Sequence, residues 1–145
     1  MELWRISNYS DLSGIGGLRA GSVAFAGQAD RLLADHASSA LLEMLVHMDR
    51  DLIPASYQLL RIVVPDDIAL ETVDTELPPD WRSQTLTSRE IGDRWLDRTT
   101  SALLRVPSAI SGKGDNFLLN PAHPDAAMVT VAEIIRAPFD PRLLA

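Results

Sequence analysis

Two side chains in this sequence have a type and a setting that could serve chemistry, a glutamate and a serine. Glu43 interrupts the apolar segment LLEMLVHM, and helical spacing places it on one face with Ser39 and His47. A carboxylate at the edge of a cleft can stabilise positive charge or act as a base, whereas in an ordinary surface pair it faces solvent with His47. Ser108 follows Pro107 at the end of an expected strand, where it either presents its hydroxyl to a ligand or is a turn residue. The residues alone therefore suggest a Glu and Ser cleft and leave its function open.

Several common catalytic and binding motifs are missing from the chain. No Gly-x-Ser-x-Gly sequence surrounds Ser108, so a triad nucleophile is unsupported. The glycine-rich stretch 7–21 lacks the Walker and Rossmann patterns, and it is either a loop near a ligand or a long connection. The three histidines show no metal-ligand spacing, and cysteine is absent. We therefore expect no metal site and no disulfide.

The composition is that of a folded domain of modest size. The 145 residues suffice for one hydrophobic core and not for two, so we expect a single domain over residues 1–145. Hydrophobic residues make up 46% and charged residues 23%, which is typical of a globular chain. The net charge of -7 disfavours direct binding to nucleic acid. No apolar run has the length of a signal peptide or membrane span, so the cytoplasm is the expected location.

The hydrophobic pattern predicts short strands and two helices. Apolar residues recur at helical spacing from Ala34 to Met48, with Asp35 or Ser38 as the N-cap. A second amphipathic helix is expected over 87–97, capped by one of its first two residues.

The expected strands are irregularly spaced between these helices. They cover 3–6, 57–64, 68–73, 101–107 and 128–135, and 111–116 is expected to be a loop. Because strands and helices do not alternate, we predict an α+β fold with a mixed β-sheet and flanking helices.

Three segments of the chain resemble the RES-domain family, the toxins of RES/Xre type II toxin-antitoxin modules. They are LWRIS with the following GIGGLRA, SSALLEMLVH, and RVPSAI followed by NFLLNPAHPDA. The resemblance extends over essentially the whole chain. It implies a fold similar to the diphtheria-toxin-like ADP-ribosyltransferases, with NAD⁺ as substrate and no separate cofactor. It also implies growth arrest, either through degradation of NAD⁺ by hydrolysis or phosphorolysis or through ADP-ribosylation of a cellular protein.

The resemblance assigns site residues one by one. The family glutamate matches Glu43 and the family serine matches Ser108, which would be the catalytic residues and would also contact NAD⁺. Arg5, in LWRI, matches an arginine expected near the dinucleotide. The resemblance further implies an Xre-type antitoxin as the protein partner, and it allows a dimer within the toxin-antitoxin complex.

One window departs from the family pattern, although its flanks match on both sides. Ser22 and Val23 stand where the family has Arg and Trp, and Leu32 stands where it has Tyr. Permitted codons for this window, when they are translated one base later, encode RWHSRGRPIVY, which restores the family residues in register. We therefore hypothesise a one-base insertion before Ser22, compensated by a one-base loss near Leu33.

The altered window has an expected consequence for function and another for structure. Without the Arg and the Tyr the chain would be attenuated or inactive as an enzyme, and a chain that only binds its antitoxin is the alternative. The window now contains helix-forming residues, so it either extends the first helix back to about Gln28, becomes disordered, or forms a poor strand imposed by the sheet.

Overall fold

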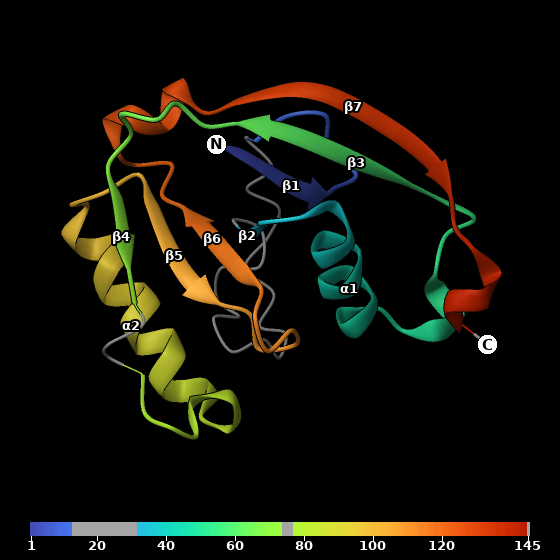
Figure 1. Ribbon diagram of the computed structural model, residues 1–145, viewed down its shortest axis with the longest axis horizontal. Coiled ribbons are helices and arrows are strands. Elements are labelled where there is room, and N and C mark those ends of the chain that lie inside the picture. Colours follow the sequence, from blue (N-terminus) through green and yellow to red (C-terminus); the bar gives the residue numbers. More distant parts are fainter. Residues whose placement is uncertain (13–31, 74–76, 145) are drawn as a thin grey trace.

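A mixed β-sheet organises the computed structural model, which describes residues 1–12, 32–73 and 77–144 (Figure 1). The described strands are β1 (Glu2–Ile6), β2 (Leu32–Ala34), β3 (Ser56–Val63), β4 (Leu70–Thr72), β5 (Leu103–Pro107), β6 (Asp115–Leu119) and β7 (Thr130–Pro138). They form one sheet in the order β4-β5-β6-β2-β1-β3-β7. Of these neighbours, β4 and β5 run parallel and the other pairs run antiparallel. The predicted α+β class with a mixed sheet is confirmed.

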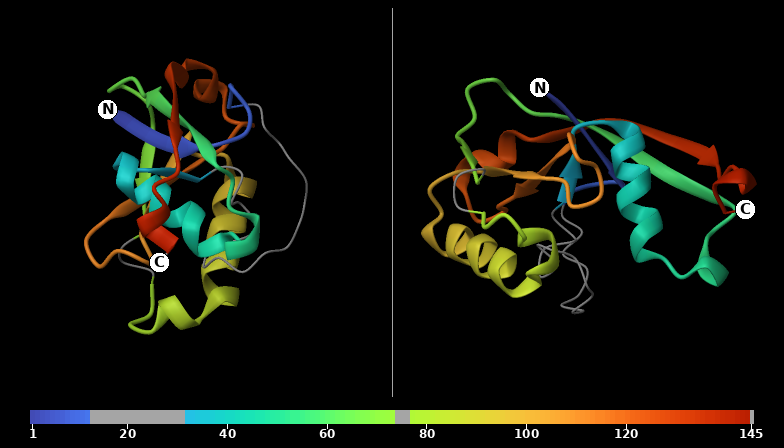
Figure 2. Two further views of the ribbon diagram at one scale, coloured as in Figure 1. Left: turned by 90° about the vertical axis from the view of Figure 1, so that its right-hand side faces the viewer. Right: turned by 60° about the horizontal axis from the view of Figure 1, so that its bottom comes forward.

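Two α-helices pack on the same face of this sheet. They are α1 (Ala37–His47) and α2 (Thr85–Arg98), and Figure 2 shows both on one side of the strands. The register explains why, because alternate residues of a strand share a face. In β6, Leu118 packs with Trp95 of α2, and Asn116, two residues earlier, contacts Glu43 of α1. Short 3₁₀ helices lie at Arg50–Leu52, Trp81–Ser83, Pro124–Met128 and Pro141–Leu144.

Apolar packing differs between the two faces of the sheet. The face turned away from the helices carries a cluster of buried residues from five strands, Leu3, Leu33, Leu60, Ile62, Leu103, Phe117 and Leu119. On the helix-bearing face, Trp95 is 1% exposed and packs against Leu104 and Val106 of β5. Its indole Nε1 donates a hydrogen bond of 2.7 Å to Ser101 Oγ, which satisfies its one polar atom. The strongest apolar packing on this face therefore lies under α2.

The first helix begins three residues later than the sequence predicts. Ala34 ends β2 and pairs with Asn116 of β6, so its backbone belongs to the sheet. His36, not Asp35 or Ser38, is the N-cap, and its side chain accepts a hydrogen bond from the backbone N–H of Ser38. The proposed backward extension of this helix is also wrong for residues 32–34, because Leu32–Ala34 is a strand. In this strand the sheet imposes its geometry, as another of the predicted alternatives states. Ser22 and Val23 lie outside the described residues.

Most of the other predicted elements are present with shifted limits, and one strand of the sheet was not predicted. The strands expected over 57–64, 68–73 and 101–107 correspond to β3, β4 and β5, whereas the strand expected over 128–135 begins at Thr130 and continues to Pro138. β6 was not predicted, and its first two residues were wrongly assigned to the preceding loop. In α2 the N-cap is Gln84, which makes no side-chain capping hydrogen bond. Neither helix of the described residues is long and apolar enough to cross a bilayer.

Candidate active site

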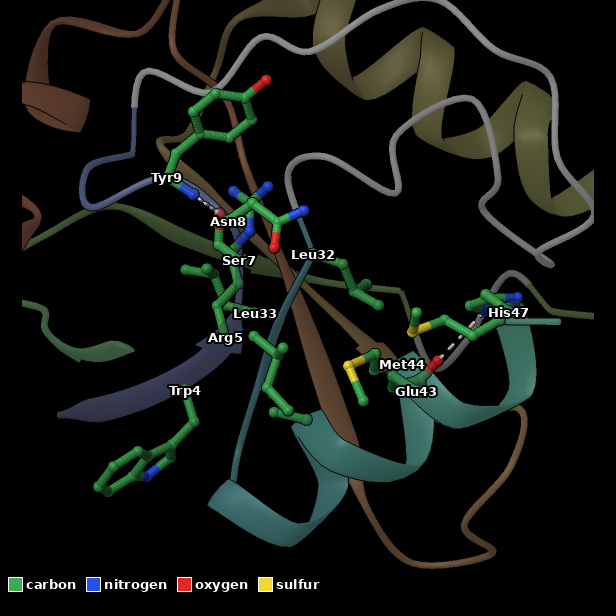
Figure 3. Close-up of a pocket in the computed structure, with 14 residues that line it drawn as sticks. Trp4, Arg5, Ser7, Asn8, Tyr9, Leu32, Leu33, Glu43, Met44 and His47 are labelled. Carbon is green, nitrogen blue, oxygen red and sulfur yellow. Dashed lines mark hydrogen bonds and ion pairs between the residues drawn. The ribbon is translucent and has the colours of Figure 1, made fainter. Parts of the chain in front are cut away.

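Glu43 lies between α1 and the sheet, where three segments of the chain converge on its carboxylate. Only 8% of the residue is exposed, which rules out the solvent-facing interpretation. Asn116 Nδ2 donates a hydrogen bond of 2.6 Å to Glu43 Oε1, and Ser108 Oγ donates to the same oxygen at 3.3 Å. The other oxygen, Oε2, lies 3.8 Å from His47 Nε2 (Figure 3). The predicted meeting of Glu43 and Ser108 is therefore found in the structure.

Small side chains make room for this arrangement. Asn116 lies opposite Ala34 in the β2–β6 pair, so the two side chains point to the same face of the sheet, towards α1. Ala40, one turn before Glu43 on α1, is also buried. A larger residue at either alanine would occupy space beside the carboxylate. The sequence thus places the glutamate where the helix approaches the sheet closely.

The hydroxyl of Ser108 is fully used within the protein. Its oxygen accepts hydrogen bonds from the backbone N–H groups of Ile110 and Ser111, at 3.2 and 3.0 Å. A serine hydroxyl has one proton and two lone pairs, so the proton is directed to Glu43. In this arrangement Ser108 fixes the turn that follows β5 and orients the carboxylate. A direct contact between Ser108 and NAD⁺ stays a prediction.

The contacts to Glu43 favour its ionised form. Burial alone raises the pKa of a carboxyl group, because it removes water from the charge. The imidazole of His47, 3.8 Å from Oε2, and the hydrogen bonds from Asn116 and Ser108 act in the opposite direction and together outweigh it. The pKa of Glu43 is therefore below its ordinary value of 4.5, and the site holds a carboxylate at neutral pH.

A pocket of about 290 Å³ opens beside Glu43 (Figure 3). Arg5 lines it from β1 and extends in the figure towards Asn8 and Tyr9, whereas Glu43 and His47 line it from α1. The pocket therefore has a guanidinium on one side and a carboxylate on the other. Such an arrangement suits a ligand that has both an anionic group and a developing positive charge. The volume is near the lower end for small-molecule sites, roughly 300–1,000 Å³.

The structure brings some of the predicted site residues into this pocket and leaves others out. Arg5, Leu32 and Glu43 line it, while Ser108 touches Glu43 without being part of the lining. Leu32 is half-buried at the start of β2. Across the ranges that the structure describes, no group of three or more His, Asp or Glu side chains is arranged to hold a metal ion.

Asn116 begins the segment NFLLNPAHPDA, which carries part of the family resemblance, but it was not predicted to be a site residue. It is 5% exposed and makes the shorter of the two hydrogen bonds that Glu43 accepts, the other being from Ser108. A signal was available in DNFLL, where a lone amide begins an apolar run that proves to be a strand. Its pairing with Glu43 could not be foreseen, because β6 was not predicted.

Comparison with known proteins identifies the family. Residues 2–140 match the model of the RES domain. The chain belongs to the RES-domain family. The Toxin Res of Pseudomonas putida is 43% identical over 129 residues, which cover 87% of this chain and 88% of that protein. The Prs ADP-ribosylating toxin of a Sphingobium species is 33% identical over 155 residues, covering 99% and 96% of the two chains.

The family assignment agrees with the resemblance of the three sequence segments. A third relative, the Toxin Res of Yersinia enterocolitica, is 32% identical over 120 residues, which cover 81% of this chain and 79% of the relative. These relatives are all named as toxins, and one of them as an ADP-ribosylating toxin. The mixed sheet with two helices on one face is consistent with an ADP-ribosyltransferase-like fold.

Proposed function

We propose that this chain is the toxin of a toxin-antitoxin pair and that its site cleaves the bond between nicotinamide and ribose in NAD⁺. One observation carries the proposal, the buried and ionised Glu43 at a pocket that Arg5 also lines. The RES-domain relatives support the toxin role. The protein partner would be an Xre-type antitoxin.

The proposed reaction uses the carboxylate to stabilise charge. When the glycosidic bond breaks, its electron pair goes to the nicotinamide nitrogen, and positive charge develops on ribose C1′ and the ring oxygen. Glu43 Oε2 is not occupied by Asn116 or Ser108, and it can stabilise that charge. Water, or phosphate in phosphorolysis, then forms a bond to C1′, and a water nucleophile releases one proton to the solvent. Arg5 would hold the pyrophosphate through its fork of donors.

We infer further that the activity of this chain is attenuated. The family pattern has a Tyr where Leu32 lines the pocket and an Arg where Ser22 stands. A leucine cannot donate a hydrogen bond, and a serine cannot provide a charged, bidentate contact to phosphate. Losing a buried charged contact commonly costs about 2–5 kcal/mol of binding free energy.

Restoring the window tests both parts of this proposal. Three purified proteins are compared: the present chain, a chain with residues 22–32 replaced by RWHSRGRPIVY, and that restored chain carrying Glu43→Gln. Nicotinamide release from NAD⁺ is followed by liquid chromatography, with and without phosphate. We expect the restored chain to be at least about tenfold faster than the present one, since one lost contact of this kind exceeds 1.4 kcal/mol. Glu43→Gln should remove the gain.

Each part of the proposal has its own contrary result. If the present chain cleaves NAD⁺ as fast as the restored chain, attenuation is wrong. If the restored chain releases no nicotinamide, cleavage of NAD⁺ is wrong. Unchanged release after Glu43→Gln would remove Glu43 from the reaction.

ADP-ribosyl transfer to a protein is the second candidate. The Sphingobium toxin, whose name states this activity, aligns with 99% of the present chain and supports it. Transfer and hydrolysis break the same bond and differ in the acceptor. Adenylate-labelled NAD⁺, incubated with the restored chain in a cell extract, should leave label on protein for transfer and only in small products for hydrolysis or phosphorolysis. A chain that binds an Xre-type antitoxin but shows neither outcome after restoration would be a binding module.

A further inference from the structure

The orientation of the Asn116 side-chain amide is determined by its hydrogen bond to the carboxylate of Glu43. Its Nδ2 donates to Glu43 Oε1 at 2.6 Å, and the residue is 5% exposed. The reversed amide would bring its oxygen against the carboxylate oxygen at the same short distance, which is repulsive. In the described part of the chain, Oδ1 of Asn116 has no hydrogen-bond partner. The amide group therefore donates a hydrogen bond to Glu43, while its buried oxygen accepts none from the described residues.

A second asparagine, just past the other end of β6, provides the contrast. Asn120 is 2% exposed, and both of its polar atoms have partners. Its Nδ2 donates to the backbone oxygen of Leu96, and its Oδ1 accepts from the backbone N–H of Ala122. This is the usual bonding of a buried asparagine that stabilises a fold. An unpaired buried acceptor is unfavourable, so Asn116 is poorly suited to a purely structural role.

We propose that Asn116 is a positioning residue that anchors Oε1 of Glu43 to the sheet and leaves Oε2 as the oxygen that acts on the substrate. The role of Oε2 rests on the proposed function, but the contacts of Asn116 with Glu43 are observed without reference to any substrate. Oε1 accepts two hydrogen bonds, one from Asn116 in β6 and one from Ser108, the residue that follows β5. Oε2 faces His47, which lines the pocket with Glu43. The two oxygens of one carboxylate would therefore have different tasks.

Within the residues that the structure describes, few other charged groups face this carboxylate. His47 lies four residues further along α1, and Arg5 and Tyr9 line the same pocket from β1 and the segment after it. Asp115, the neighbour of Asn116 in β6, is paired with Arg105 of β5. Glu43 and His47 are thus the titratable pair at ion-pair distance in this site. Changing Asn116 alters a neutral donor and leaves these charged groups in place.

Carbon-13 NMR of the glutamate carboxyl groups tests the assignment in the intact chain. The chain is labelled at glutamate Cδ, and the Glu43 signal is identified by its loss in Glu43→Gln. Titrations are compared for wild type, Asn116→Leu, Asn116→Asp and the matched controls Asn120→Leu and Asn120→Asp. Leucine has a branched shape similar to asparagine but no donor, and aspartate is nearly isosteric but carries charge.

The expected results separate positioning from simple packing. Without the amide donor, the Asn116→Leu variant should titrate Glu43 at a higher pH than wild type. In Asn116→Asp, two carboxyls share the site, so they should titrate as a coupled pair with one step well above the ordinary range. The Asn120 variants should unfold at lower denaturant concentration and leave the Glu43 titration unchanged.

Contrary results are equally distinct. A wild-type titration curve for Glu43 in Asn116→Leu overturns the assignment, as does an equal shift in the folded Asn120 variants. If Asn116→Leu does not fold, the coupled titration of Asn116→Asp decides. In the chain with the restored window, Asn116→Leu should lower kcat more than it raises KM. Because the titration needs no turnover, absence of NAD⁺ cleavage would count against the proposed function alone, and an absent shift would count against positioning alone.

Discussion

The two helices of this protein pack on the same face of one sheet but are held there by different interactions. Helix α2 places Ile91 and Trp95 in an apolar cluster with β5 and β6. The buried residues of α1 are Ala40 and Glu43, a small side chain and a carboxylate. On its outer side α1 leaves Val46 58% exposed. Helix α2 is thus held to the sheet mainly by burial of apolar side chains. Helix α1 instead has a carboxylate, that of Glu43, at a buried position facing the sheet.

Polar contacts replace the missing apolar contacts of α1. Asp35, which precedes the helix, accepts a hydrogen bond from Ser39 Oγ at 2.8 Å and another from the backbone N–H of Asp115 at 2.9 Å. These bonds tie the first turn of α1 to the start of β6, next to Asn116. Since a net hydrogen bond is weaker than burial of a large side chain, α1 should contribute less to stability than α2. What it supplies is the placement of Glu43.

Removal of the largest buried side chain of α2 should have the greatest effect on stability. Trp95→Ala is expected to lower the free energy of unfolding by about 3–5 kcal/mol, since it leaves a cavity and removes the hydrogen bond that the indole donates to Ser101 Oγ. Urea unfolding followed by circular dichroism measures this loss. Trp4→Ala is the comparison on the α1 side, because Trp4 is a half-buried tryptophan that packs with Ala40. Equal losses for the two variants would contradict the difference between the helices.

The pH dependence of stability should reveal the buried carboxylate of Glu43 on α1. The folded-state pKa of Glu43 is lowered, so its ionised form stabilises the fold above about pH 4.5. This contribution decreases as the pH falls through the folded-state pKa. Glu43→Gln lacks this titration, so acidification from pH 7 to pH 3 should destabilise the wild type more than the variant. The difference between the urea-unfolding free energies of wild type and Glu43→Gln, measured at each pH, isolates the contribution of Glu43 from that of the other acidic residues. Parallel pH profiles of the two proteins would contradict the stabilising role of ionised Glu43.

These two regions also differ in how well the sequence predicts them. The apolar spacing of residues 87–97 directly predicts a helix with Trp95 on its inner face, because periodicity and burial agree there. The limits of α1 are less predictable, because Ala34 continues the same apolar spacing but pairs with Asn116 of β6. A residue distant in the chain thus determines where the helix starts. Local pattern cannot contain that information.

The candidate site shows the same limit more strongly. Helical spacing predicts that Glu43 and His47 are neighbours, and the structure confirms it. Glu43 and Ser108 are 65 residues apart; their residue types suggested a shared cleft, and the family resemblance added that they act together. Asn116 was missed because its strand follows a glycine-containing loop and is only five residues long. The sequence therefore identified the carboxylate and its serine partner but not Asn116, which makes the shorter hydrogen bond to it.

The smallest effect is expected where a single polar contact holds α1. Ser39→Ala removes the bond to Asp35 and should lower the unfolding free energy by only about 0.5 kcal/mol. Its control is Ser83→Ala, which removes a bond of 2.8 Å to the backbone oxygen of Asp80 just before α2. The stability losses should be similar, but only Ser39→Ala should alter the NMR titration of Glu43, because only α1 depends on polar contacts to place a carboxylate. If neither variant changes that titration, the buried contacts of Glu43 hold the helix without help from its first turn. If both do, placement of the carboxylate depends on the whole sheet face, and the contrast between the two helices is wrong.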